Sequence, residues 1–284
     1  MTLAFQQSVK DLIRMRKSAR THTGAALEPA KQEALTAACA RLDRGILGEA
    51  ARFTLLEKPF VKGENVRLGN YGLQKNPRYF FAGAVKDSEM SHESYGYLME
   101  QLVLKATDLE LGTCWIGFFD KKFFADFPVN EDERFPAACT VGYPADRRFF
   151  EKISRTAVRA DKRKNWDALF FQGDFNVPFS AQTDSPYRKA LEMVRLGPSS
   201  GNSQPWRIVR ENDRPVFHFY MKKIRNIYFR AGLHHIDLGI AMCHFELTLN
   251  ELGISGRWRR RDPDLQTLPP ETAYTMTWEP RKDA

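Results

Sequence analysis

The sequence predicts an α+β protein built from two similar units in tandem. A helix followed by a Leu-Gly pair and a tryptophan occurs at 95–115 and again at 236–258. A strand ending at proline follows each of these, at 141–144 and 276–280, and a charged strand ending at proline precedes each, at 52–59 and 207–215. Two similar units in one chain can face each other as the subunits of a symmetric dimer do, which predicts a pseudo-dimer. Chance similarity between two α+β segments is the alternative.

The composition is that of a globular protein with one large or two smaller domains. The chain has 284 residues, of which 43% are hydrophobic and 27% charged. We expect a first unit over 1–165, including a basic connecting arm, and a second over 166–284. The sequence contains no apolar run near the roughly 20 residues of a membrane span. Lys10 and Asp11 come too early for the apolar core of a signal peptide, so we expect a cytoplasmic protein without a membrane partner.

Cysteine, histidine and charge patterns favour neither a metal site nor nucleic-acid binding. The four cysteines form no C-x-x-C pair and are expected to be buried free thiols. His234, His235 and His244 lack carboxylates at ligand spacing, so packing or surface roles are expected. The net charge of +8 keeps nucleic-acid binding open as an alternative. The basic runs lack interleaved aromatic residues, so no nucleic-acid partner is expected.

In the first half, apolar residues at helical spacing predict helices over 5–20, 29–42 and 94–111. Strands are predicted at 52–56, 79–85 and 135–141. After the third helix, Gly112 suits a left-handed cap position.

A polar, basic connection over 147–182 leads to the second half. Helices are predicted there over 187–196 and 236–252, and strands at 207–210, 216–220 and 274–278.

Two short segments combine residue types suited to binding a ligand. Arg16, Ser18 and Arg20 lie where a helix gives way to extended chain, and guanidinium groups match phosphate oxygens in pairs. A basic helix end that complements the helix dipole is the alternative. The second segment, Leu196–Trp206, reads L-G-P-S-S-G-N-S-Q-P-W and joins a helix to a strand. Its small side chains would let a flat ligand approach, and Ser199, Ser200, Asn202 and Gln204 offer hydrogen-bonding groups. An ordinary turn is the alternative.

The two halves do not repeat these segments. The first half has no Pro-Ser-Ser-Gly-Asn segment at its equivalent stretch, 42–51. The second half has no Arg-x-Ser-x-Arg at its equivalent, 185–189. Each half therefore retains a different piece of one site.

Four motifs together resemble the nitroreductase family of flavoproteins: R-K-S-A-R at Arg16–Arg20, E-L-G-T-C-W-I-G at Glu110–Gly117, V-G-Y-P at Val141–Pro144, and G-P-S-S-G-N-S-Q-P-W at Gly197–Trp206. The resemblance implies a nitroreductase-like α+β fold in two tandem copies, each with a mainly antiparallel sheet flanked by helices. Family members are usually homodimers with FMN at the subunit interface. A fused pseudo-dimer is implied here, acting as a monomer or a weak homodimer.

The resemblance also implies the cofactor-binding residues. Arg16, Lys17, Ser18 and Arg20 would hold the FMN phosphate, while Pro198, Ser199, Ser200 and Asn202 would line the ring system. The segment Cys114, Trp115, Ile116 and Gly117 would face the flavin N5 region. Arg163, with Lys162 and Lys164 as alternatives, would supply a further basic group, and Asn70 would come from a loop that touches the flavin.

The implied function is that of an FMN-dependent NAD(P)H oxidoreductase. Hydride would pass by ping-pong kinetics to a small electron-poor acceptor such as a nitroaromatic or a quinone. The flavin would carry the chemistry, so no catalytic side chain and no metal are expected. Because only one of the two symmetric positions keeps both segments, we expect one flavin per chain. The alternative is a catalytically silent relative that kept the fold and binds a flavin or another ligand.

Overall fold

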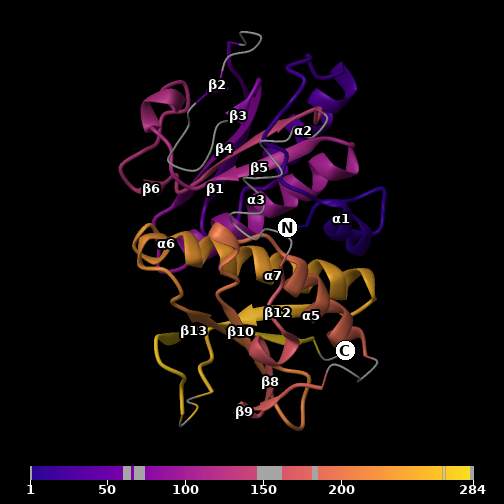
Figure 1. Cartoon of the computed structure of the whole chain (residues 1–284), viewed down its shortest axis with the longest axis vertical. Helices are drawn as coiled ribbons and strands as arrows, with labels where there is room; N and C mark the ends of the chain where they lie inside the picture. Colours follow the sequence, from indigo (N-terminus) through magenta and orange to yellow (C-terminus); the bar gives the residue numbers. More distant parts are fainter. Residues whose placement is uncertain are drawn as a thin grey trace. The chain divides into compact units, whose positions relative to one another are not determined.

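The computed structural model describes residues 2–59, 65–66, 74–145, 162–180, 185–263, 265 and 267–281. The chain forms two compact units, Met1–Asp161 and Lys162–Ala284, each with its own sheet and helices (Figure 1). The sequence placed the boundary at residue 165. The structure assigns Arg163 and Lys164 to the second unit because both hydrogen-bond to it, to Asn202 and Gln204 respectively.

The first unit has an antiparallel sheet in the order β1-β4-β7-β5. Its main strands are β1 (Ala51–Glu57), β4 (Tyr79–Lys86), β5 (Gly112–Ile116) and β7 (Ala138–Gly142). The short strand β6 (Glu133–Arg134) pairs with β4, and β2 (Asn65–Val66) pairs with β3 (Gln74–Lys75). The helices are α1 (Val9–Met15), α2 (Pro29–Arg41) and α3 (Ser91–Asp108), with a 3₁₀ turn at Lys121–Phe124.

Strand β4 and helix α3 form the core of this unit. All residues of β4 except Lys86 are buried, as expected for a central strand covered on both faces. Helix α3 is buried along most of its length, and its Tyr95 hydroxyl donates a hydrogen bond to the Ala137 carbonyl beside β7. Helix α1 is shorter than the helix predicted over 5–20, because the chain becomes extended from Arg16 onward.

The second unit has a sheet in the order β12-β13-β11-β10-β8-β9. Its strands are β8 (Phe170–Gln172), β9 (Asp174–Pro178), β10 (Trp206–Arg210), β11 (Phe217–Lys222), β12 (Gly256–Arg259) and β13 (Thr272–Pro280). Its helices are α5 (Pro186–Leu196), α6 (Asn226–Arg230) and α7 (Leu233–Glu251). Part of the predicted connection at 147–182 is therefore sheet: β8 pairs in parallel with β10 and continues into β9.

The two units repeat one framework. The order β1-β4-β7-β5 in the first unit matches β10-β11-β13-β12 in the second, and every one of these pairs is antiparallel. The tryptophan after each long helix is also tied back to that helix. Trp115 donates to Glu100 Oε2 of α3 at 2.9 Å, and Trp258 donates to Glu246 Oε2 of α7 at 2.8 Å.

Both long helices end in a Schellman motif, and the prediction of a left-handed Gly112 is wrong. The left-handed residue of the first unit is Glu110 (φ 61°), with Leu111 N bonded to Ala106 O at 2.8 Å. In the second unit Gly253 (φ 79°) takes this place, with Ile254 N bonded to Leu249 O at 2.9 Å. Gly112 instead begins β5, where a Cβ atom would lie 2.6 Å from the Ala19 Cβ.

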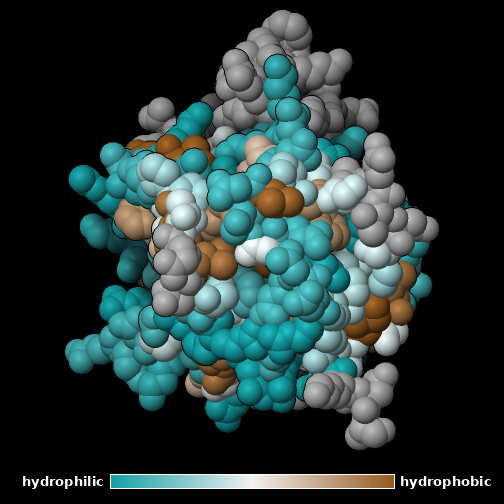
Figure 2. Space-filling model, turned by 90° about the horizontal axis from the view of Figure 1, so that it is seen from below, coloured by the Kyte–Doolittle hydropathy of each residue, from teal (hydrophilic) through white to brown (hydrophobic). Residues whose placement is uncertain are grey.

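No helix among the described residues is long and apolar enough to cross a membrane. The molecular face drawn in Figure 2 is mostly hydrophilic, and its apolar residues gather in small, separate groups. Such scattered apolar residues are normal on a protein surface.

Replacing Glu110 by glycine is expected to stabilise the protein. A left-handed non-glycine residue costs about 1–2 kcal/mol, partly offset by the chain entropy that glycine loses on folding, which leaves about 0.5–1 kcal/mol. The thermal unfolding midpoint should rise by about 1–3 °C. Gly253→Ala is the matched control and should lower the unfolding midpoint. Because the added Cβ would meet open space, the strain of the φ of 79° is the cause of this loss. A lower midpoint for Glu110→Gly would contradict this assignment of strain.

Candidate functional site

The basic segment of the first unit is an extended chain held between two strands. Ser18 pairs in parallel with Thr113 of β5, and Ala19 N donates to Thr113 O at 2.8 Å. On the β3 side, Lys75 N donates to Arg20 O at 2.8 Å and His22 N donates to Lys75 O at 2.9 Å. Successive side chains of an extended chain alternate between two faces, so Ser18 and Arg20 share one face.

Arg16 begins this extended segment and is buried, with 9% of its surface exposed. Its backbone has φ −56° and ψ 119°, which ends α1. Its Nε atom is buried without a hydrogen-bond partner, and its guanidinium forms no ion pair with any residue that the structure describes. Lys17 is exposed, and Ser18 and Arg20 are partly exposed.

Close packing fixes the path of this segment. The 2.6 Å approach that a Gly112 Cβ would make to Ala19, and the 3.1 Å approach to Pro144, leave room for glycine alone. Further along, His22 is buried with its Nε2 atom 3.2 Å from the Thr140 hydroxyl of β7. Burial lowers the pKa of His22 to about 4, so the ring is neutral at neutral pH.

The segment Cys114–Gly117 is mostly strand β5, where the sequence predicted only a loop after the helix. Cys114 is buried, and its sulfur accepts a hydrogen bond from Gln74 Nε2 at 3.6 Å. Gln74 was not predicted as a site residue. Its Oε1 atom is buried without a hydrogen-bond partner, which makes it a polar group available beside β5. In the sequence, a single glutamine after a glycine-rich stretch did not indicate a binding role. Asn70 lies outside the described residues.

In the second unit, the Pro-Ser loop (Pro198–Gln204) has an unusual backbone. Gly201, Asn202 and Gln204 all have left-handed conformations, with φ of 56°, 55° and 48°. A Cβ atom on Gly201 would lie 2.5 Å from the Tyr228 hydroxyl. Packing against Tyr228 and the positive φ therefore both require glycine at this position.

Asp237 of α7 anchors the loop from one side and was not predicted from the sequence. Its Oδ1 atom accepts from the Ser200 backbone N at 2.9 Å and from the Ser200 hydroxyl at 3.2 Å. Asp237 is fully buried, and this burial raises the pKa of its carboxyl group. Its Oδ2 atom lies 3.4 Å from His234 Nδ1. Asp237 did not stand out in the sequence as His234, His235 and His244 did, because an aspartate inside a helix carries no distinctive signal.

The basic stretch Lys162–Lys164 anchors the loop from the other side. Arg163 donates to Asn202 Oδ1 and to the Leu196 carbonyl, both at 2.9 Å, and Asn202 Nδ2 donates to the Lys162 carbonyl at 2.7 Å. Lys164 N donates to Gln204 Oε1 at 2.8 Å. The side chains of Arg163 and Asn202 are thus bonded to each other, and this pair sets the position of both.

The structure brings the predicted residues together in two groups, one in each unit. In the first unit, Arg16–Arg20 lies along β5, which carries Cys114, Trp115 and Ile116. In the second unit, Arg163 hydrogen-bonds to the Pro-Ser loop, which contains Pro198, Ser199, Ser200 and Asn202. Their roles toward a ligand stay predictions. Two of the histidines of α7 lie beside buried polar groups: His244 Nδ1 is 3.0 Å from the Met193 carbonyl, and His234 Nδ1 is 3.4 Å from Asp237 Oδ2. Within the described residues, no group of three or more His, Cys, Asp or Glu could hold a metal ion.

The family follows from comparison with known proteins. A family model described as "Putative TM nitroreductase" matches residues 8–249. The chain belongs to this family. The match confirms the resemblance drawn from the motifs, and the chain is an α+β nitroreductase-like protein of two tandem units. No curated protein matches it.

Solved nitroreductase structures show similar folds. A putative nitroreductase from Thermotoga maritima aligns over 98% of this chain and 95% of its own, with 18% identity and a TM-score of 0.55. A putative nitroreductase in complex with FMN from Desulfovibrio desulfuricans covers 52% of this chain and 95% of its own, with 19% identity and a TM-score of 0.38. A nitroreductase with bound FMN from Bacteroides fragilis covers 51% and 92%, with 17% identity and a TM-score of 0.42.

His22 is expected to make this nitroreductase-family protein less stable in mild acid. Because burial lowers its pKa from 6.5 to about 4, the unfolded state binds a proton first as the pH falls. Its contribution is complete above pH 6.5 and is lost between pH 6.5 and 4, on the order of 3 kcal/mol. His22→Gln should flatten the fall in unfolding free energy across this range. Equal slopes for wild type and variant, measured by urea unfolding, would contradict the assignment.

Asp237→Ala is expected to loosen the Pro-Ser loop and to cost about 2–3 kcal/mol, because both buried hydrogen bonds from Ser200 to the carboxyl group are lost. Faster hydrogen exchange at the Ser200 amide is the local measurement. Asp237→Asn is the matched control, since its amide oxygen can still accept both bonds, and it should exchange more slowly than Asp237→Ala. If the two variants exchange alike, the carboxylate does not hold the loop.

Proposed function

We propose that this protein is an FMN-dependent NAD(P)H oxidoreductase that reduces a small electron-poor acceptor, such as a nitroaromatic or a quinone. Its nitroreductase family and the two groups of predicted site residues support this proposal. The observation that carries it is Arg16, a buried guanidinium beside an extended Ser18–Arg20 segment, with no acidic partner in the described part of the chain.

The residues of the first unit fit a phosphate group. Burying a charged group without a partner is costly, and Arg16 has a buried Nε atom with no acceptor. A phosphate would supply that acceptor and would also suit the Ser18 hydroxyl and the Arg20 guanidinium on the alternate positions of the extended chain. Since β5 fixes this segment through Ser18 and Ala19, these groups are positioned before any ligand arrives.

The residues of the second unit fit a role in lining the ligand. Ser199, Ser200 and Asn202 already hydrogen-bond to Gln204, Asp237 and Arg163, so their side chains hold the loop in shape. The loop then presents Pro198 and a rigid backbone. A rigid loop loses little entropy on binding, which favours the recognition of a flat ring.

FMN, when bound, supplies the centre that accepts and donates hydride. The chain's own residues bind and orient: Arg16, Ser18 and Arg20 hold the phosphate, and the Pro-Ser loop and β5 line the ring. No described side chain is assigned a proton-transfer step. We propose that NAD(P)H and the acceptor occupy the same place in turn, which gives ping-pong kinetics. Small molecules are the only partners proposed, and the chain would act as a monomer or a weak homodimer.

The chemistry of the loop before β1 favours one FMN per chain over two. It occupies the place in the first unit that the Pro-Ser loop has before β10. There the Ile46 N donates to Ser94 Oγ at 3.0 Å, and Ser94 Oγ donates to Glu49 Oε2 at 3.0 Å. A carboxylate at this loop opposes an anionic ligand, and a Cβ on Gly45 would lie 2.8 Å from Ser94. This loop therefore lacks the chemistry for a second flavin.

Arg20→Ala is expected to purify with at least tenfold less FMN per chain than wild type, because a bidentate contact to phosphate is lost. The absorbance of the flavin near 450 nm against total protein measures it, and wild type should hold one FMN.

Arg14→Ala is the matched control, since this exposed arginine of the same basic run pairs with Asp11 at 3.1 Å and should retain FMN. Equal FMN in both variants would overturn the phosphate assignment. A flavin-loaded wild type that does not oxidise NADH or NADPH would instead favour a catalytically silent relative.

A further inference from the structure

A second group of basic residues lies at the end of the Pro-Ser loop, in the second unit. Arg207 Nη1 donates to the carbonyls of Gln204 and Trp206 at 3.1 and 2.6 Å. Lys164 N donates to Gln204 Oε1 at 2.8 Å, and Lys222 N donates to Pro205 O at 2.8 Å. Three residues from separate parts of the chain are thus tied to one short turn. We call Lys164, Arg207 and Lys222 the basic cluster.

Sheet register places Arg207 and Lys222, two of the three residues of the basic cluster, on one face. In the antiparallel pair β10–β11, Arg207 lies opposite Tyr220, and Trp206 lies opposite Met221. Because side chains alternate along a strand, Arg207, Tyr220 and Lys222 lie on the same face. Helix α7 covers the other face, where the Phe217 and Phe219 rings contact Phe245 in tilted and edge-to-face arrangements, with centroids 5.0 and 5.4 Å away.

The basic cluster has no acidic partner among the residues that the structure describes. The side chains of Lys164, Arg207 and Lys222 form no ion pair within the described part of the chain. Arg207 is nevertheless buried, with only 8% of its surface exposed. The Tyr220 hydroxyl on the same face is buried, and no described group forms a hydrogen bond with it.

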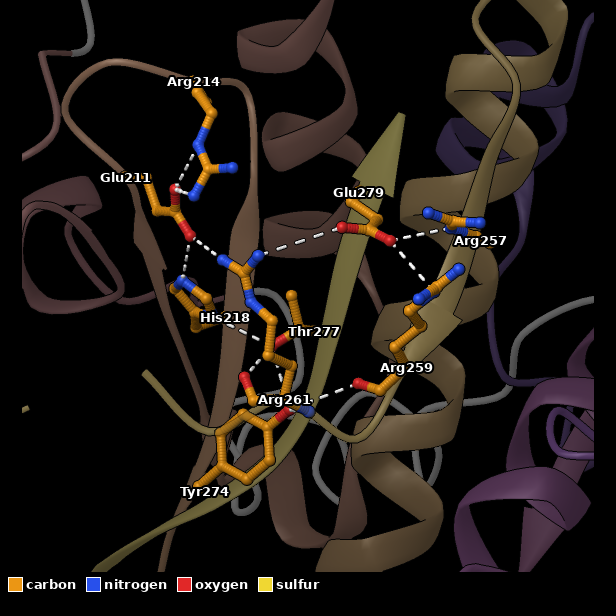
Figure 3. A network of polar contacts seen from close by, with 9 residues as sticks. All are labelled: Glu211, Arg214, His218, Arg257, Arg259, Arg261, Tyr274, Thr277 and Glu279. Carbon is orange, nitrogen blue, oxygen red and sulfur yellow. Dashed lines mark hydrogen bonds and ion pairs between the residues drawn. The ribbon is translucent and has the colours of Figure 1, made fainter. Parts of the chain in front are cut away.

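Four other arginines of this unit pair with glutamates, as Figure 3 shows. Glu211 pairs with Arg214 at 2.7 Å and with Arg261, while Glu279 pairs with Arg257 and Arg259 at 2.7 and 2.9 Å. Glu211 and Glu279 thus neutralise these four arginines, whereas no described carboxylate pairs with the basic cluster.

The cluster is electrostatically unfavourable by itself. Burial, followed by the charges of Arg207 and Lys222, lowers the pKa of Lys164 to about 8. Burial also lowers the pKa of Arg207 to about 10. These like charges form no ion pair with a described carboxylate, and the backbone bonds of the turn hold their residues in place. A bound anion would relieve their repulsion.

We propose that Lys164, Arg207 and Lys222 bind a phosphate group at the end of the Pro-Ser loop, separate from the group at Arg16–Arg20. Three cations match the multiple negative charge of a phosphate or diphosphate better than a single carboxylate. The source is the phosphate of a bound nucleotide, of the flavin, or free phosphate. The site stands on its own residues; only the choice among nucleotide sources rests on the proposed function.

Titration calorimetry with inorganic pyrophosphate tests the site on the full-length protein. Lys222→Gln should weaken pyrophosphate binding roughly tenfold, because one charge-assisted contact is lost. Lys164→Gln should act alike and serves if one variant folds poorly. Lys223→Gln is the matched control: this neighbour pairs with Glu271 at 3.5 Å and should bind as wild type does. The difference should persist in an Arg20→Ala background, which removes the group in the first unit.

Two further measurements on Lys222→Gln identify the source. A loss of co-purified FMN assigns the site to the flavin phosphate. Unchanged FMN with a KM raised more for NADPH than for NADH assigns it to the extra phosphate of NADPH, and equal rises assign it to the diphosphate that both share. If pyrophosphate binding alone weakens, the ligand is free phosphate or another phosphate ester.

Equal pyrophosphate affinity in Lys222→Gln, Lys164→Gln and Lys223→Gln would overturn the inference. The pyrophosphate test does not depend on the proposed function. If the wild-type protein held no FMN but Lys222→Gln still weakened pyrophosphate binding, the oxidoreductase proposal would be refuted and the phosphate site would stand.

Discussion

The contact between Asp237 and Ser200 is the interaction on which the second unit's candidate site depends. The Pro-Ser loop holds Asn202 and Gln204 in left-handed conformations, each of which costs about 1–2 kcal/mol in a non-glycine residue. Such a backbone persists only when surrounding bonds determine it. Asp237 fixes one side of the loop through Ser200, and the stretch Lys162–Lys164 fixes the other through Asn202 and Gln204. The side chains expected to read a ligand are first of all the ones that shape the loop.

The first unit also anchors its corresponding loop to the long helix, but with the carboxylate on the loop instead of on the helix. Its loop before β1 is also held by a side chain of the long helix, but there a hydroxyl, Ser94 Oγ, receives the Ile46 N–H. The acid lies on the loop instead, as Glu49. Moving the carboxylate from the helix to the loop keeps the framework and changes what the loop can bind. A repeated fold therefore accommodates two different loops, and only one of them combines an anchored backbone with freedom from negative charge.

The sequence predicted the parts whose chemistry is local. The Pro-Ser loop and the two long helices follow from turn residues and apolar spacing. The first helix was predicted over 5–20 but ends at Met15, before the extended segment that pairs with β5. The sequence could not predict Glu110 in a left-handed position, because glycine at 112 offered the commoner solution and the true reason for Gly112 is its approach to Ala19, far away in the chain. Asp237 and Gln74 were missed for the same reason. Each is an ordinary residue in its own segment and becomes distinctive only through a tertiary neighbour, Ser200 or Cys114.

Positive charge in this protein is of two physical kinds, although the net charge of +8 does not distinguish them. Arginines such as Arg257 and Arg261 pair with glutamates, which already neutralise their charge. Arg16 and Arg207 are buried and pair with no carboxylate among the described residues. Buried, unpaired charge lowers the stability of the free protein, and a ligand that neutralises it binds the folded state alone. Neutralising these buried arginines with an anion would therefore stabilise the folded protein and favour anion binding. For this reason the positions of the buried arginines indicate function better than the overall net charge does.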